Sequence, residues 1–193
     1  MNSHSGTPPG FIITRTGRKV KKALDIITLS PFTEEQYHRF FRGYVQDPLM
    51  SSVPFRYNRE QVTNSYRYNY GGFQKGYAHY GIFLEEEPVG CFQLKRIDPE
   101  KRVCEFGIIL QSDRYKNRGI GTAAIRIGME IARKEFGVRT VFGDTMGRNV
   151  RMRRVFEKLD FELCETVKDA VELSDGGFDD RLVWKKQLEE RKG

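Results

Sequence analysis

The chain has 193 residues, of which 38% are hydrophobic and 31% are charged, a length and balance that suit one globular domain with a full core. No apolar run approaches the roughly 18 residues of a membrane span, and the N-terminal segment MNSHSGTPPG is unlike a secretory signal, so we expect a cytoplasmic protein without a membrane partner. Most of the net charge of +7 lies in residues 1–24, which hold five basic residues and no acidic one. Because a nucleic-acid-binding protein usually spreads its positive charge over a folded face, this distribution argues against nucleic acid as a partner.

The N-terminal part of the chain predicts a tail followed by strands. Residues 1–10 are polar with two prolines and are expected to be disordered, which leaves residues 11–193 as a single domain. Residues 11–20 have the pattern of a short hairpin with Gly17 at its turn, and residues 24–29 have that of a strand.

Two helices follow. Thr33 and Gln36 have the spacing of a capping box, which predicts a helix start within the segment SPFTEEQYHRFFRGY. Asn58 is expected to cap the second helix, which Gly71 ends.

The middle of the chain predicts paired strands and a long helix. Residues 75–84 and 88–97 are joined by the acidic turn EEE, and residues 102–110 form a third strand. Apolar residues then recur at helical spacing from Gly119 to Gly137.

The last quarter predicts a strand at 138–145, a helix at 149–159 and strands at 161–167 and 178–188. The order of strand, two helices, three strands, helix, strand, helix and two strands predicts one mixed α/β domain.

The segment RYKNRGIGTAAI, residues 114–125, joins a strand to a helix and combines cations with glycines. A helix N-terminus presents unpaired N–H groups with a partial positive charge, and glycine lets an anion approach the backbone closely. This loop therefore predicts a phosphate site. The Walker pattern is excluded because its Gly-Lys-Ser/Thr end is missing, and a Rossmann opening is disfavoured because this strand comes late in the chain.

KNRGIG resembles the [Gln/Arg]-x-x-Gly-x-[Gly/Ala] signature of the GNAT superfamily of acyl-CoA-dependent N-acyltransferases, with Lys116 at the Gln/Arg position. NVRMRRVFEKLDF resembles the family's second signature through Asn149, Val155, Phe156, Lys158 and Phe161. The run RMRR and Asp160 depart from it, and Asp160 replaces a glycine that would take a left-handed conformation. The pattern is most similar to the branch of ribosomal-protein amino-terminal and polyamine acetyltransferases.

The resemblance implies a central twisted mixed sheet that splays open between two parallel strands, with helices on its faces. Acetyl-CoA would lie in the opening as cosubstrate, with its pyrophosphate on the loop and its pantetheine arm along the strand ending IILQ. The contacting residues would be Ile109, Leu110, Gln111, Lys116, Asn117, Arg118, Gly119, Ile120, Gly121, Thr122 and Asn149. No metal is expected, since the three cysteines and three histidines have no metal-ligand spacing.

The resemblance also suggests catalytic residues. Glu105 is the candidate general base, with an ion pair to a nearby cation as the alternative. Asn149 is either a helix cap, a coenzyme contact or both. Phe156 stands where many members have a tyrosine near the sulfur of the coenzyme. Phenylalanine has no proton to give, so the identity of the general acid is left open, and Phe156 is expected to form part of the wall of the site. We interpret Arg148, Arg151, Arg153 and Arg154 as a solvated helix face, with contact to the phosphoadenosine end as the alternative.

The implied acceptor is a primary amine, and the sequence leaves open whether it belongs to a protein N-terminus, a polyamine, an antibiotic such as an aminoglycoside, or a small metabolite. The implied entrance is lined by residues 50–73 and by acidic residues near the C-terminus, namely Asp169, Glu172, Asp175, Asp179 and Asp180. A binding-only relative of the family and a nucleic-acid-binding module that uses residues 15–22 are the alternatives. Both a monomer and a homodimer are compatible with the sequence.

Overall fold

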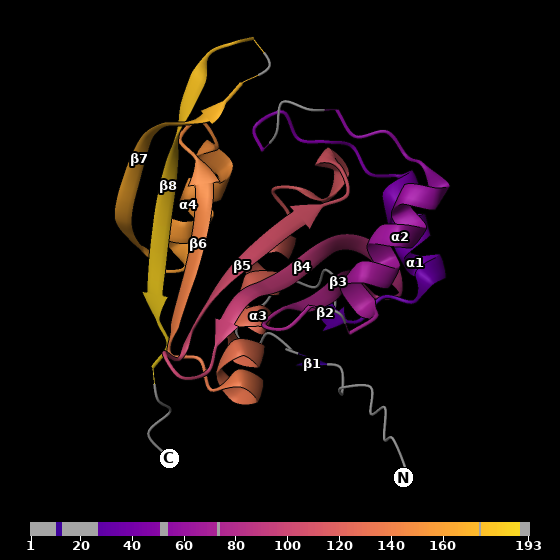
Figure 1. The fold of residues 1–193 in the computed structure, drawn as a ribbon, viewed down its shortest axis with the longest axis horizontal. Coiled ribbons are helices and arrows are strands. Elements are labelled where there is room, and N and C mark those ends of the chain that lie inside the picture. Colours follow the sequence, from indigo (N-terminus) through magenta and orange to yellow (C-terminus); the bar gives the residue numbers. More distant parts are fainter. Residues whose placement is uncertain (1–10, 13–26, 51–53, 73, 174, 190–193) are drawn as a thin grey trace, which may run out of the picture.

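The computed structural model describes residues 11–12, 27–50, 54–72, 74–173 and 175–189. In this part of the chain, eight strands form one mixed sheet (Figure 1). In spatial order the strands are β1 (Phe11–Ile12), β2 (Ile27–Ser30), β3 (Ala78–Leu84), β4 (Glu87–Asp98), β5 (Val103–Leu110), β6 (Thr140–Met146), β8 (Phe178–Gln187) and β7 (Glu162–Glu172). The predicted tail, the turn of the first hairpin and the basic segment 15–22 lie outside the described residues.

The helices begin and end at the predicted caps. In α1 (Glu34–Arg42), Thr33 and Gln36 form both bonds of the capping box. Asn58 accepts a hydrogen bond at the start of α2 (Arg59–Tyr70). The long helix α3 (Ile120–Phe136) runs between Gly119 and Gly137, both in the left-handed conformation.

The helix α4 (Val150–Lys158) is followed by Asp160 at a φ of +55°. The N–H of Phe161 donates to the carbonyl of Phe156 across this turn. Asp160 thus takes the left-handed conformation that the family's glycine would supply. A short 3₁₀ helix, η1 (Asp113–Tyr115), was not predicted, and β7 extends five residues beyond its predicted end.

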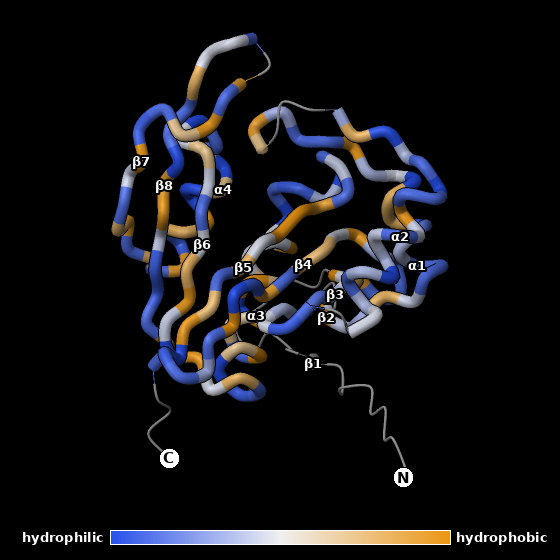
Figure 2. Tube along the Cα trace, in the orientation of Figure 1, coloured by the Kyte–Doolittle hydropathy of each residue, from blue (hydrophilic) through white to orange (hydrophobic). Residues whose placement is uncertain are grey.

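Two hydrophobic clusters lie on opposite faces of the sheet. The larger one joins α3 and α4 to the sheet through residues such as Phe92, Ile127 and Phe156. The smaller one joins α1 and α2 to the other face, with Phe32 and Phe40 at its centre. Figure 2 shows the hydrophobic stretches of the chain within β4, β5 and α3.

The sheet parts at its centre. β5 and β6 pair in parallel, but only over Val103–Glu105 opposite Thr140–Phe142, whereas the other described strand pairs are antiparallel. Beyond this short contact the two strands diverge (Figure 1). The expected mixed sheet that splays between two parallel strands is confirmed. No helix in the described ranges has both the length and the apolar character required to span a bilayer.

Candidate active site

The loop between β5 and α3 is shaped by left-handed residues. Asn117 has a φ of +57° and Gly119 a φ of +83°, which turns the chain into the first turn of α3. Gly119 is the N-cap and provides no side-chain cap. The N–H groups of Ile120, Gly121 and Thr122 belong to the turn that has no partner within the helix, so they are available to an anion. The N–H of Lys116, in contrast, already donates to the carbonyl of Asp113 at 3.1 Å.

A pocket opens beside this loop, and we call it the loop pocket. Its wall combines the loop with β5, α3 and α4. Seven of the predicted site residues line it: Leu110, Lys116, Asn117, Gly119, Gly121, Thr122 and Asn149. An added Cβ at Gly119 would meet no atom within 4 Å, and one at Gly121 would meet only the Ile108 side chain at 3.9 Å. The backbone here therefore faces open space into which a ligand can fit.

Of the remaining predicted contacts, Ile120 is buried in the core, and Arg118 is exposed on the loop.

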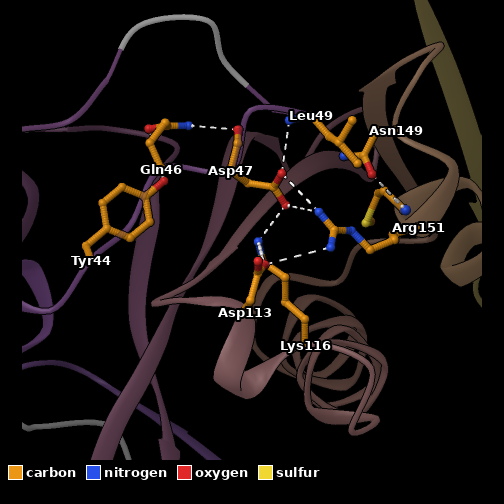
Figure 3. Close-up of polar contacts among 9 residues, drawn as sticks. Tyr44, Gln46, Asp47, Leu49, Asp113, Lys116, Asn149 and Arg151 are labelled. Atoms are coloured by element: carbon orange, nitrogen blue, oxygen red, sulfur yellow. Dashed lines mark hydrogen bonds and ion pairs between the residues drawn. The ribbon is translucent and has the colours of Figure 1, made fainter.

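A buried carboxylate, Asp47, holds two cations, and all three side chains belong to residues that line the loop pocket (Figure 3). Lys116 Nζ lies 2.6 Å from Asp47 Oδ2 and 2.6 Å from Asp113 Oδ1. The Arg151 guanidinium donates to both oxygens of Asp47 at 3.0 and 2.8 Å. Asp47 thus ties the segment between α1 and α2 to the loop and to α4.

The pKa of Asp47 reflects opposing effects. Burial alone would raise the pKa, but hydrogen bonds from Lys116 and from the Leu49 N–H, with the charges of Lys116 and Arg151, hold it below its ordinary value. The carboxylate is therefore ionised at neutral pH. Lys116 and Arg151 are cations of the kind that pair with phosphate groups, and both are held here by Asp47 and Asp113.

The hydrogen-bond pattern of β5 shows which peptide groups are already used. In an antiparallel pair, residues bonded to the neighbouring strand alternate with residues whose N–H and C=O point the other way. Gln111 donates its N–H to the Val89 carbonyl at 2.9 Å, and its own carbonyl accepts from Val45 at 2.7 Å. Ile109, two residues away, therefore bonds to β4 as well.

The even-numbered residues of β5 direct their backbone N–H and C=O groups toward β6. The carbonyl of Arg102 accepts from the N–H of Thr140 at 3.1 Å, and the pairing with β6 ends at Glu105. The peptide groups of Ile108 and Leu110 are therefore directed to where the strands part, without a partner from β6. These two residues offer the edge to which an extended ligand can bond.

A second pocket lies on the face of the sheet that α1 and α2 cover. We call it the tyrosine pocket, since Tyr37, Tyr70 and Tyr80 contribute to its wall. The rest of its lining is Phe41, Asn69, His79, Cys91, Phe92, Gln93, Gly107, Ile108 and Ile109. Ile108 lines both pockets, so they meet at the free edge of β5. No aspartate or glutamate is found among the described residues that line the tyrosine pocket.

Asn149 and Phe156 have separate roles on α4. Asn149 Oδ1 accepts from the Met152 N–H at 3.0 Å, which confirms the helix cap, and the residue also lines the loop pocket. Phe156 is fully buried, with its ring stacked 5.2 Å from that of Trp184. Phe156 therefore belongs to the core and lies outside the lining of both pockets.

Glu105 is engaged in an ion pair. Both of its carboxylate oxygens accept from Arg96 Nη1, at 2.5 and 2.6 Å. Glu105 lines neither the loop pocket nor the tyrosine pocket. This ion pair corresponds to the alternative given above to a role of Glu105 as general base.

Two of the acidic residues near the C-terminus, Asp179 and Asp180, bond to other groups of the protein. Asp179 accepts from the backbone N–H of Arg148, and Asp180 bonds to Lys168 at 2.7 Å. Neither lines the loop pocket or the tyrosine pocket. In the described part of the chain, no group of three or more histidine, cysteine, aspartate or glutamate side chains could hold a metal ion.

Sequence reasoning missed three residues of the site. Asp47 stands in an irregular segment without a motif, and its partners are 69 and 104 residues away. Arg151 was interpreted as part of a solvated helix face, with contact to the phosphoadenosine end as the alternative, and its bonds to Asp47 were not predicted. His79 was noted only as an isolated histidine, because its pocket neighbours come from other elements.

Comparison with known proteins identifies the family. A family model described as an acetyltransferase (GNAT) domain matches residues 27–162. No curated protein sequence matches the chain. Among solved structures, the Microcin C7 self-immunity acetyltransferase MccE, in complex with acetyl-CoA and AMP, has a TM-score of 0.72 at 16% identity over 84% of this chain and 92% of its own.

Two further structures share the fold. RimL, a ribosomal L7/L12 alpha-N-protein acetyltransferase in complex with coenzyme A, has a TM-score of 0.70 at 18% identity over 84% of this chain and 94% of its own. The spermidine N-acetyltransferase of Vibrio cholerae has a TM-score of 0.65 at 13% identity over 83% and 93%. With the family model covering most of the chain and the splayed sheet in place, the chain belongs to the GNAT family of acetyltransferases, which transfer an acetyl group from acetyl-CoA to amines.

Proposed function

We propose that the protein binds acetyl-CoA in the loop pocket and transfers its acetyl group to a primary amine whose remaining body carries no charge. The observation that carries this proposal is the meeting of the two pockets at Ile108. A coenzyme whose phosphates lie on the loop can extend along β5 and bring its thioester to the tyrosine pocket. MccE in complex with acetyl-CoA and RimL in complex with coenzyme A, which share this fold, support coenzyme binding by this chain.

The coenzyme contacts are assigned from the free groups of the loop and strand. The first-turn N–H groups of α3 would bind the pyrophosphate, with Lys116 and Arg151 adding charge. The pantetheine arm would pair with Ile108 and Leu110, since the backbone of Gln111 is bonded elsewhere. Direct attack by the amine then forms the C–N bond and releases the thiolate of coenzyme A.

The acceptor class follows from the lining of the tyrosine pocket. Aromatic rings and uncharged amides suit an apolar or aromatic body with a single amino group. A polyamine would place a second cation beside no carboxylate of this lining, where its desolvation would be uncompensated. An aromatic monoamine or a peptide N-terminus with an uncharged first side chain is therefore the expected substrate.

Isothermal titration with acetyl-CoA tests the coenzyme site. Release of free coenzyme A thiol with phenethylamine, alanine amide and spermidine then tests the acceptor. We expect binding of acetyl-CoA, and a kcat/KM for phenethylamine or alanine amide at least tenfold above that for spermidine. Binding without thiol release from any amine would favour the binding-only relative. A preference for spermidine would contradict the acceptor class.

A further inference from the structure

One row of side chains crosses the floor of the tyrosine pocket. His79 of β3 stands opposite Gln93 of β4, and Gln93 stands opposite Gly107 of β5. Directly opposed residues share a face of the sheet, and all three line the tyrosine pocket. Gly107 has no side chain, and the Gln93 side chain extends over it, since an added Cβ at Gly107 would lie 3.0 Å from Gln93 Nε2. Ile108, the next residue of β5, joins the two pockets. An amino group beside Ile108 would therefore reach the imidazole alongside the Gln93 amide, across the roughly 10 Å between β3 and β5.

The hydrogen bond of His79 fixes which ring nitrogen can accept a proton. Its Nε2 lies 3.0 Å from the side-chain oxygen of Gln74. An amide oxygen only accepts hydrogen bonds, so Nε2 carries the hydrogen and Nδ1 keeps a free lone pair. The neutral tautomer needed for a base is therefore already selected.

The surroundings of His79 keep it neutral. Burial lowers the pKa of His79, and no charged side chain offsets that effect. The titratable groups on the α1 and α2 side of the pocket are Tyr37 of α1, Tyr70 of α2 and Cys91 of β4, and Tyr77 stacks on the imidazole with ring centroids 6.2 Å apart. Tyr80 of β3 lines the pocket, but its ring packs in the larger cluster, on the face of the sheet that α3 covers. Burial raises the pKa of Tyr37, Tyr70 and Cys91, and raises the pKa of Tyr80 to about 12. These four groups are uncharged at neutral pH.

We propose that His79 is the general base that accepts the proton of the acceptor ammonium. The proposal rests on the proposed function, because it requires the amine in the tyrosine pocket. His79 Nδ1 takes one proton, and the freed nitrogen lone pair attacks the thioester carbonyl carbon. The C–N bond forms, the C–S bond breaks, and the second proton of the nitrogen goes to the departing sulfur. His79 then returns its proton to water, so each turnover yields amide, coenzyme A and one proton.

The pH dependence of turnover with the fastest amine of the panel tests this role. In the wild type, kcat is expected to fall as the pH drops through an apparent pKa below 6.5, because protonated His79 cannot accept a proton. His79→Gln keeps a donor for Gln74 but has no base. We expect it to lower kcat by about 10²- to 10⁴-fold and to abolish this acidic limb, with unchanged affinity for acetyl-CoA.

Two variants serve as matched controls. His38 is the other described histidine, and it is buried, whereas His79 is half-buried; His38 bonds to Tyr57 and Thr63 and lines neither pocket. Both His38→Gln and Glu105→Gln should keep the acidic limb. A limb that persists in His79→Gln, or one that disappears in Glu105→Gln instead, would overturn the proposal.

A second His79 variant distinguishes the loss of a base from the loss of folding. In His79→Ala, added imidazole should raise kcat, whereas it should have no effect on His38→Gln; no rescue in a folded His79→Ala would also count against the base. The coenzyme titration separates the two levels of inference. A wild type that does not bind acetyl-CoA contradicts the proposed function, while normal binding with normal turnover in His79→Gln contradicts only the role of His79.

Discussion

Gly119 combines a left-handed conformation with a position on the wall of the loop pocket. At a φ of +83°, a branched side chain is strained, and its carbon atoms would occupy the space beside the first-turn N–H groups. We expect Gly119→Val to weaken acetyl-CoA binding by more than tenfold in isothermal titration. Gly121→Ala is the control, because its Cβ has room and the family signature admits alanine there; its affinity should stay within about threefold of the wild type.

Asp47 is predicted to link stability to pH. Replacement by asparagine removes charged hydrogen bonds to Lys116 and Arg151, and should lower the free energy of unfolding by roughly 2 kcal/mol at pH 7. The folded-state pKa lies below the ordinary value of 3.8, so this contribution is present above that pH and is lost as the pH falls through the lowered pKa.

Urea unfolding of the wild type and Asp47→Asn between pH 2 and pH 8 measures this effect. The difference between the two proteins should be constant above about pH 5 and shrink in acid. A difference that is absent at pH 7, or that grows as the pH falls, would mean that the ion pairs do not stabilise the fold.

At the scale of elements, the packing of α3 on the sheet outweighs its helix propensity. A Cβ at Gly128 would lie 2.1 Å from a ring carbon of Phe92, which is buried and stacks on Phe106. Gly128→Ala gains up to about 1 kcal/mol of helix propensity but forces this ring to move, which costs about 1–3 kcal/mol. We expect net destabilisation in urea unfolding. Gly121→Ala, in the same helix without this contact, should be neutral or stabilising.

The elements themselves were largely predictable, because their signals are local. The capping box at Thr33 and the glycines at both ends of α3 set helix boundaries within a few residues. The alternation along β5, with Cys104 and Phe106 buried, gave the strand and its faces. The loop before α3 was recognisable because an anion site there needs little more than a helix N-terminus and glycine.

The contacts across elements were not predictable in the same way. The pairing of Asp47 with Lys116 and Arg151 depends on where the irregular segment between α1 and α2 lies relative to the loop and to α4. Glu105 was singled out by its place on the strand, but its bond to Arg96 depends on a register shift in β4 between Lys95 and Asp98. The tyrosine pocket likewise assembles residues from two helices and three strands, which no single stretch of sequence reveals.

For the whole molecule, coenzyme binding should raise stability measurably. A ligand that binds only the folded state, at 100 times its dissociation constant, adds about 2.7 kcal/mol to the free energy of unfolding. For a chain of this length, that corresponds to an increase in Tm of roughly 5–10 °C. Thermal unfolding with and without coenzyme A measures it, and Gly119→Val should show little of this increase. An equal shift in both proteins would place the coenzyme elsewhere.

The parting of β5 from β6 leaves a row of peptide groups without a strand partner in the middle of a sheet. Such unsatisfied edges are where foreign strands add and where aggregates begin. An extended coenzyme arm would protect this edge much as an additional strand would. The supply of coenzyme is therefore expected to govern the lifetime of the enzyme in the cell as well as its rate.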